Sequence, residues 1–189
     1  MELTDKQAFL GKYYEHLYSK ISSIDYKLLE DCANLILETK IKNKKIIFAG
    51  NGGSAAISSH STIDILKNLN IFTMNFNEAS FLTCFANDYG YERWLEKAVE
   101  FYGKEGDLAI FISSSGSSPN IINGAKKAKE KNLNLITLSG FSETNPLRKL
   151  GDINLWIDSK TYNIVELTHE IWLLSIVDSI IKNNDYQGL

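Results

Sequence analysis

Apolar residues recur at intervals of three and four along the first part of the chain. Between Asp5 and Leu37 this spacing predicts helix, and Ser22 and Ser23 interrupt the apolar stripe. We therefore expect two helices in residues 1–40. Their apolar faces carry more bulky aromatic side chains than one small sheet needs, which favours packing against another subunit. Covering the chain's own sheet is the alternative.

Beyond residue 41, short apolar runs alternate with helical patterns. Four runs rich in β-prone residues predict strands, at residues 46–50, 108–112, 133–140 and 152–158. Helical periodicity follows the first two runs and returns in residues 164–183. Because a parallel return needs a crossover long enough to hold a helix, this order predicts an α/β fold, a doubly wound parallel sheet flanked by helices in a flavodoxin-like three-layer arrangement.

No linker divides the sequence, which has only two prolines and no low-complexity run. We expect a single domain over residues 1–189, with an N-terminal helical segment at 1–40 and an α/β core at 41–189. The chain has 44% hydrophobic and 23% charged residues, which is typical of a globular domain of this length.

Charge and cysteine content exclude several partners and locations. A net charge of −3 supplies no positive field for phosphate backbones or anionic lipid, so neither nucleic acid nor membrane is an expected partner. The N-terminus lacks a basic region followed by an apolar run, and no apolar stretch reaches membrane-spanning length. Cys32 and Cys84 form no CxxC pair. We expect a cytoplasmic protein without disulfides.

Two strand-to-helix turns are rich in glycine and serine: the glycine turn, residues 50–54 (GNGGS), and the serine turn, residues 113–118 (SSSGSS). Glycine lets a ligand approach the backbone, serine hydroxyls donate hydrogen bonds, and a helix N-terminus favours anions. Both turns would lie at the carboxyl ends of parallel strands, where open α/β sheets bind ligands. The pair predicts a phosphate site, with ordinary helix capping as the alternative. Neither turn is GxGxxG or a lysine-bearing P-loop, so no nucleotide cofactor is expected.

Two pairs of histidine and acid stand at helical spacing. His60 and Asp64 are four residues apart, and Glu166 and His169 are three apart, so each pair shares a helix face. Brought together, these groups are able to move protons or hold a divalent metal. Packing roles for the histidines and solvation of the acids are the alternative.

The segment ANDYGYE, residues 86–92, is a further candidate for ligand contact. Asn87 and Asp88 carry oxygens that accept hydrogen bonds from sugar hydroxyls, and the amide also donates. A plain loop is the alternative.

These motifs together resemble a known family. AGNGGSAAxxxH, ANDYGYE, SxSGxSPN and the end of the last helix are similar to the SIS (sugar isomerase) family, and within it to the phosphoheptose isomerases, over about residues 29–180. The resemblance implies a homotetramer with sites at subunit boundaries and a phosphorylated sugar as partner. It also implies conversion of sedoheptulose 7-phosphate to glycero-manno-heptose 7-phosphate for bacterial surface polysaccharide, either lipopolysaccharide or capsule.

The resemblance also implies roles for individual residues. His60 falls on a zinc ligand, and Asp64 falls on a carboxylate that serves as both ligand and proton-transfer base, where the family usually has Glu. The implied sugar-phosphate contacts are Asn51, Gly52, Gly53, Ser54, Asn87, Asp88, Ser113, Ser114, Ser115 and Ser118.

The last helix departs from the family pattern. Val165 stands at the usual Gln, and Leu173 or Leu174 stands at the usual catalytic His. His169 and Glu166 are then the candidates for the catalytic acid. Zinc is an option that rests on His60 and Asp64 with few further donors. Two functions stay open: an isomerase with Asp64 as base, or a non-catalytic phosphosugar-binding or regulatory protein, including a homologue of an initiator-binding protein of bacterial replication.

Overall fold

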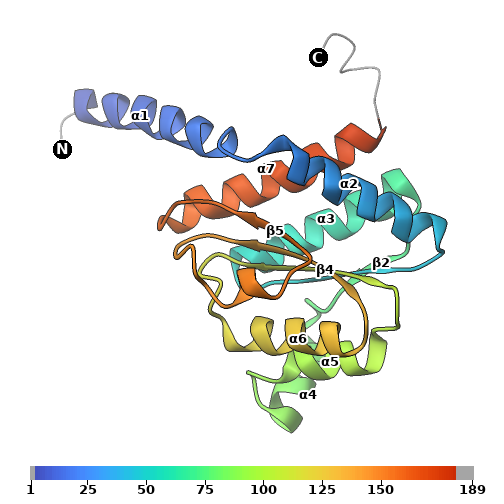
Figure 1. Cartoon of the computed structure of the whole chain (residues 1–189). Helices are drawn as coiled ribbons and strands as arrows, with labels where there is room; N and C mark the ends of the chain where they lie inside the picture. The colour runs from blue at the N-terminus through green and yellow to red at the C-terminus, as the bar shows by residue number, and fades with distance from the viewer. Residues whose placement is uncertain (1–2, 182–189) are drawn as a thin grey trace.

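The computed structural model describes residues 3–181 and is built around one parallel sheet (Figure 1). Its strand order is β2-β1-β3-β4-β5, and every neighbouring pair is parallel. The strands are β1 (Ile46–Ala49), β2 (Thr73–Asn75), β3 (Leu108–Ser113), β4 (Asn134–Ser139) and β5 (Ile153–Trp156). The predicted α/β fold with a doubly wound parallel sheet is confirmed.

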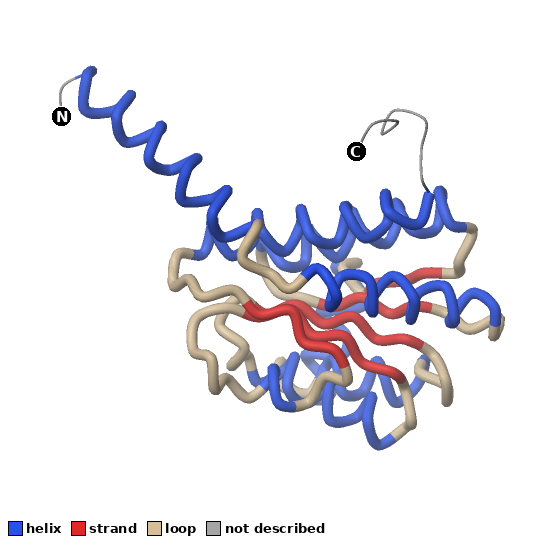
Figure 2. Tube along the Cα trace, turned by 45° about the horizontal axis from the view of Figure 1, so that its top comes forward, coloured by secondary structure: helices blue, strands red, loops and turns tan. Residues whose placement is uncertain are grey.

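Helices cover both faces of this sheet (Figure 2). One face carries α2 (Tyr26–Ile41), α3 (Gly53–Leu69) and α7 (Tyr162–Ile181), with α1 (Leu3–Ile21) packed on α7. The other carries α5 (Trp94–Tyr102) and α6 (Pro119–Glu130), with α4 (Ala79–Tyr89) beside α5. A short 3-10 helix spans Leu147–Lys149.

The alternating side chains of the strands build two separate cores. All six residues of β3 are buried, and Leu108, Ile110 and Ile112 belong to the core under α2, α3 and α7. Ala109 and Phe111 point the other way, into the core under α5 and α6. A strand covered on both faces is apolar throughout, which is why the sequence shows a continuous run here rather than an alternation.

Two elements differ from the sequence-based expectation. The edge strand β2 was not predicted, because it has only three residues and does not lie in a run of β-prone residues. The segment 86–92 was expected between helical segments, but Asn87 and Asp88 lie in the last turn of α4, which ends at Tyr89.

The N-terminal helices form as predicted and break between residues 21 and 26. Helix α1 extends beyond the rest of the molecule (Figure 2). Phe9, Tyr14 and Tyr18 on this helix are each more than 60% exposed, at 61%, 65% and 71%. Within one chain, these rings lack an apolar surface to cover them.

Within residues 3–181, none of the helices is both long enough and apolar enough to cross a bilayer.

Candidate functional site

The glycine turn connects β1 to α3 at the carboxyl edge of the sheet. Gly52 has a φ of +55°, a conformation that glycine adopts without steric cost, and it stands at the N-cap of α3. Ser54 is buried against Gly50, so its side chain packs inside the turn. Asn51 is the residue of this turn that makes side-chain hydrogen bonds.

The serine turn connects β3 to α6 at the same edge. The Ser118 hydroxyl accepts a hydrogen bond from Ser113 Oγ at 3.2 Å, and Ser115 Oγ accepts one from the Ser117 amide at 3.2 Å. Ser114 Oγ is buried and has no hydrogen-bond partner among residues 3–181. Buried hydroxyls are normally paired, so this unpaired group is a candidate for contact with a ligand atom. The N-terminus of α6 adds free amides and a partial positive charge, which together suit a phosphate.

The two turns are tied to each other by an amide pair. Asn51 Nδ2 donates to Asn120 Oδ1 at 3.0 Å, and Asn120 Nδ2 donates to Asn51 Oδ1 at 2.8 Å. Tyr91 also donates to Asn51 Oδ1, at 3.2 Å. Because Asn120 lies in the first turn of α6, this pair fixes the glycine turn against the start of the serine-turn helix.

A cavity opens beside the glycine turn, between α1, α3 and α7. Its volume is about 400 Å³, which is within the range of small-molecule sites. Two carboxylates line it, Glu166 and Glu170, one helical turn apart on α7. We call it the acidic cavity. Its other lining residues are Tyr13, Gly53, Ala56, Ile57, Asn163 and Leu167.

Glu166 reaches the glycine turn directly. A Cβ built on Gly53 would lie 2.2 Å from Glu166 Oε2, so the carboxylate rests where any other side chain would be. The neighbouring residue on α7, Val165, packs on Gly140, whose amide donates to the Ser114 carbonyl at 2.9 Å. The start of α7 therefore lies next to both turns.

His60 contacts α7, but its partner there is Glu170, an acid that was not among the predicted site residues. Its Nδ1 lies 2.9 Å from Glu170 Oε1, and the two side chains are 53% and 34% exposed. Glu170 is the missed residue here, and its spacing of four from Glu166 was the available signal.

Asp64 lies one turn further along α3 than His60. Its Oδ1 accepts a hydrogen bond from the Asn68 side chain at 2.7 Å, and it does not line the acidic cavity. The structure therefore brings His60 and the acids of α7 together but leaves Asp64 outside this group within one chain.

The expectation that His169 shares a working face with Glu166 is wrong. His169 is fully buried, its Nε2 donates to the Ser139 carbonyl at 3.2 Å, and burial lowers its pKa to about 4. Its ring packs near Trp172 and its Nδ1 has no partner in the described part of the chain. A neutral, enclosed imidazole is not placed to protonate a ligand, because α7 turns this residue toward the sheet.

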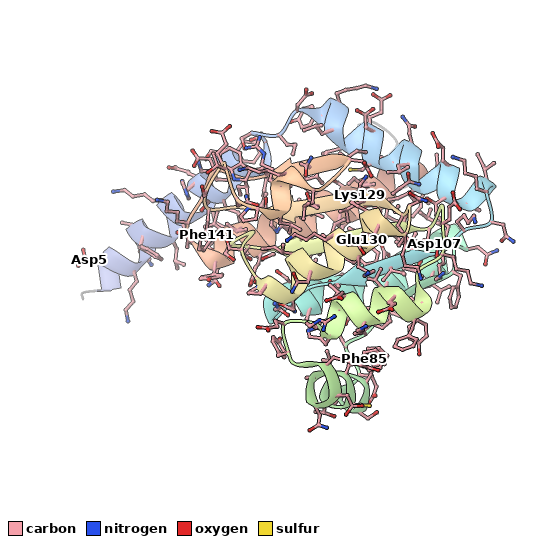
Figure 3. The ribbon with its side chains drawn as sticks, turned by 60° about the horizontal axis from the view of Figure 1, so that its bottom comes forward. Asp5, Phe85, Asp107, Lys129, Glu130 and Phe141 are labelled. Carbon is pink, nitrogen blue, oxygen red and sulfur yellow. The ribbon has the colours of Figure 1, made fainter. Side chains whose placement is uncertain are left out.

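Asn87 and Asp88 are exposed on α4 and bond to each other, with Asn87 Nδ2 donating to Asp88 Oδ1 at 3.0 Å. Asp88 borders a different cavity, between α4 and α5 near Phe85, which Figure 3 labels. Within one chain it is Tyr91, not Asn87 or Asp88, that reaches the glycine turn. Tyr91 was not among the predicted contact residues, because an aromatic side chain does not by itself indicate the polar contact that its hydroxyl makes.

A larger cavity, of about 600 Å³, lies at the opposite edge of the sheet. It includes Asp107, which forms an ion pair with Lys45. Figure 3 shows Asp107 and Phe141 at opposite ends of the sheet. None of the predicted site residues lines this larger cavity, so it is not part of the candidate site.

Zinc does not fit the donor set of a single chain. Among residues 3–181, no three His, Cys, Asp or Glu side chains lie close enough together to hold a metal ion. Catalytic zinc sites use three protein ligands and an open position. Val165, where the resemblance leads us to expect a Gln, and Leu173 or Leu174, where it leads us to expect a His, are apolar residues and supply no donor.

Comparison with known proteins agrees with this architecture. The chain matches the SIS domain family over residues 12–140. A phosphoheptose isomerase from Fusobacterium nucleatum subsp. nucleatum is 33% identical over 159 residues, covering 82% of this chain and 81% of that protein. One from Helicobacter pylori is 31% identical over 185 residues, covering 94% of both.

A solved structure extends the comparison to the fold. Phosphoheptose isomerase from Neisseria gonorrhoeae superimposes with a TM-score of 0.88 at 25% identity, covering 96% of this chain and 100% of that one. The domain match, the shared sequence and the shared fold show that the chain belongs to the SIS domain family, on the branch that contains the phosphoheptose isomerases.

Proposed function

We propose that this chain is a sugar-phosphate aldose-ketose isomerase. One observation carries the proposal: the serine turn, with an unpaired buried hydroxyl on Ser114, is tied through the Asn51–Asn120 pair to the glycine turn, which borders a cavity lined by Glu166 and Glu170. The turn and the cavity differ in charge, so a ligand with a phosphate at one end and a carbonyl at the other has one favourable orientation.

The reaction needs proton transfer between neighbouring carbons. A proton leaves C1 of the ketose and is delivered to C2, while the hydroxyl proton of O1 ends on O2, so the composition of the sugar is unchanged. The phosphate, held in the serine turn, positions the carbonyl end in the acidic cavity. Side chains of α3 and α7 are the groups available there to move these protons.

Sedoheptulose 7-phosphate is the substrate we propose. The names of the relatives support it, and the cavity volume of about 400 Å³ suits a small ligand. Use of the product for lipopolysaccharide or capsule belongs to the same proposal. The exposed aromatic face of α1 supports assembly into a homotetramer, since such a surface is normally covered.

Binding and turnover are to be measured separately. Calorimetry with sedoheptulose 7-phosphate should show binding, and Ser114→Ala should weaken it by about fivefold, as expected for the loss of one hydrogen bond. A coupled assay should show formation of the aldose phosphate. Unchanged affinity in Ser114→Ala would remove the serine turn from the site.

A sugar-phosphate sensor without activity is the second candidate. The candidate is favoured by apolar residues at positions where the resemblance leads us to expect polar catalytic groups: Val165, and Leu173 or Leu174. Exchange of the carbon-bound proton of the ligand with deuterated water distinguishes the two. Tight binding with no exchange identifies a sensor, and exchange identifies the enzyme.

A further inference from the structure

We propose that the cavity of about 600 Å³, at the edge of the sheet opposite the two turns, binds a nucleotide. Lysine side chains would hold the phosphates, and exposed aromatic rings would contact the base. The volume is within the range of small-molecule sites. Asp107, labelled in Figure 3, lines this cavity and marks its place. We call it the basic cavity. The inference goes beyond the proposed isomerase function, because none of the candidate site residues lines this cavity.

Positive charge dominates the basic cavity. Its lysines are Lys40, Lys44, Lys45 and Lys104, and Asp107 is the one acid that lines it among residues 3–181. Asp107 is 2% exposed, forms an ion pair with Lys45, and accepts backbone hydrogen bonds from the amides of Lys45 at 3.2 Å and Lys104 at 2.8 Å. Because this carboxylate is already neutralised, the charges of Lys40, Lys44 and Lys104 are left for an anionic ligand.

One of these ammonium groups is held in place before a ligand arrives. The side chain of Lys44 runs along Gly106, where a Cβ would lie 3.2 Å from Lys44 Cε. Its Nζ donates to the Glu105 carbonyl at 2.7 Å. A carbonyl group does not cancel the charge, and an ammonium has three donors, so two remain for phosphate oxygens. Lys44 is therefore a fixed positive charge, which lowers the entropy that binding costs.

The lysines are not explained by helix ends alone. Helices α2, α3 and α5 all end at this edge of the sheet, and a helix C-terminus carries about half a negative charge, which attracts a cation within the last turn. Lys40 lies in the last turn of α2 and has this structural role available. Lys44 and Lys104 lie in the connections before β1 and after α5, outside the helices. These two are the stronger candidates for phosphate contact.

Two exposed phenylalanine rings give the basic cavity an apolar side. Phe72 lies between α3 and β2 and is 64% exposed, and Phe101 lies on α5 and is 63% exposed. Phe101 contacts Phe85 edge-on, with ring centroids 5.9 Å apart, and this contact leaves most of its surface open to water. Aromatic side chains stabilise a planar base by stacking, whatever its sequence identity.

The two halves together select the chemical class of the ligand. A sugar phosphate has the anionic group but no planar apolar ring, whereas a nucleotide has both. The absence of a glycine-rich phosphate loop does not oppose this assignment, because helix N-termini and their free amides are at the other edge of the sheet. At this edge side chains supply the positive charge, as lysine does in many phosphate sites.

The first test is calorimetry on the full-length protein with ADP, pyrophosphate and adenosine. ADP should bind at least about tenfold more tightly than either part, because each part uses only half of the basic cavity. Saturating sedoheptulose 7-phosphate should leave the affinity for ADP unchanged, since the turns lie at the opposite edge. Displacement of ADP by the sugar phosphate would place ADP at the serine turn and overturn the inference.

Variants locate the two halves of the ligand. Phe72→Ala should weaken ADP binding by about fivefold or more and leave pyrophosphate binding unchanged. Lys104→Gln should weaken both by about fivefold and should reduce the dependence of ADP binding on salt concentration. Tyr26→Ala and Lys126→Gln are the matched controls, because both residues are exposed and neither lines the basic cavity. Both should bind ADP as the wild type does.

Two results would overturn the inference. The first is a wild-type protein that does not bind ADP at concentrations up to about 1 mM. The second is a loss of ADP binding in Ser114→Ala while Phe72→Ala and Lys104→Gln retain it. Activity on the sugar phosphate is a separate readout: a protein that binds ADP in this pattern but has no isomerase activity contradicts the proposed function and supports the basic cavity as a nucleotide site.

Discussion

The glycine turn and the serine turn occupy equivalent places at the ends of β1 and β3, yet they are supported differently. The serine turn rests on neutral buried groups: Asn145, which is 2% exposed, lies under Gly116, and His169 bonds to Ser139 next to Gly140. In the glycine turn, the half-buried Asn51 bonds to the buried Asn120 and to the exposed Tyr91, and the carboxylate of Glu166 lies against Gly53.

Under the proposed function, this difference assigns anion binding to the serine turn and proton transfer to the neighbourhood of the glycine turn. Among residues 3–181, no carboxylate is hydrogen-bonded to the serine turn, which keeps one buried hydroxyl unpaired and suits a fixed anion. The glycine turn lies against the carboxylate of Glu166, which would repel an anion. Two turns of similar composition are therefore proposed to have different roles because their side-chain neighbours differ.

A substitution that breaks the support of the serine turn should cause the largest loss of stability. Gly116 has a φ of +64°, and a Cβ there would lie 2.0 Å from Asn145 Oδ1. Asn145 cannot move freely, because it donates to Ser139 Oγ at 3.0 Å and to the Ser142 carbonyl at 2.8 Å. Gly116→Ala should lower the free energy of unfolding by roughly 3 to 5 kcal/mol.

Urea titration measures this loss, and Gly11→Ala is the matched control. A Cβ at Gly11, on α1, meets nothing within 4 Å, so that variant should be neutral or slightly stabilised. A Gly116→Ala protein as stable as Gly11→Ala would show that the serine turn is not rigidly supported.

Acidification should weaken the same support. The His169 pKa is about 4 in the folded chain against 6.5 for an ordinary histidine, because burial disfavours the charged ring. Below pH 6.5 the unfolded chain binds a proton that the folded chain does not, so stability is present above pH 6.5 and is lost as pH falls toward 4. The loss attributable to this residue is about 3 kcal/mol.

Urea titrations at intervals between pH 7 and 4 measure this slope. His169→Gln should be less stable at pH 7 but should lack this component of the pH dependence. An equal slope in both proteins would exclude His169 as its source.

A substitution in the glycine turn should affect turnover more than stability. In Gly53→Ala the new methyl group meets the end of the flexible Glu166 side chain, which is able to move aside. We expect kcat to fall by about tenfold, since Glu166 is displaced from the cavity, with little change in melting temperature or in affinity for inorganic phosphate. Loss of phosphate affinity in this variant would contradict the division of roles between the turns.

Metal removal should have the smallest effect on turnover. Because no three donors gather among the described residues, treatment with EDTA should leave kcat unchanged. Lost activity that zinc restores would show that residues from a second subunit complete a metal site.

The sequence predicted the elements that are long and strongly patterned. The apolar run Leu108–Ile112 and the break near Ser22 both specify structure locally, through burial and helix interruption. The three-residue strand β2 was missed, since its pairing with β1 is a tertiary contact and not a local preference.

Site residues were predictable where chain position decides their role. The places of Ser114 and Ser118, after β3 and before α6, follow directly from the strand-turn-helix order. The pairing of His60 with Glu170 was not predictable, because it depends on how α3 crosses α7, and the burial of His169 depends on the rotation of α7 about its axis.

The reciprocal amide pair between Asn51 and Asn120 has a consequence for ligand selection. Two amide groups that each donate and accept cannot slide past one another without losing both hydrogen bonds at once. Under the proposed function, the span from the serine turn to the acidic cavity is therefore fixed before any ligand arrives. We then expect a sugar phosphate with one carbon fewer to bind less well, because it cannot draw the two ends together.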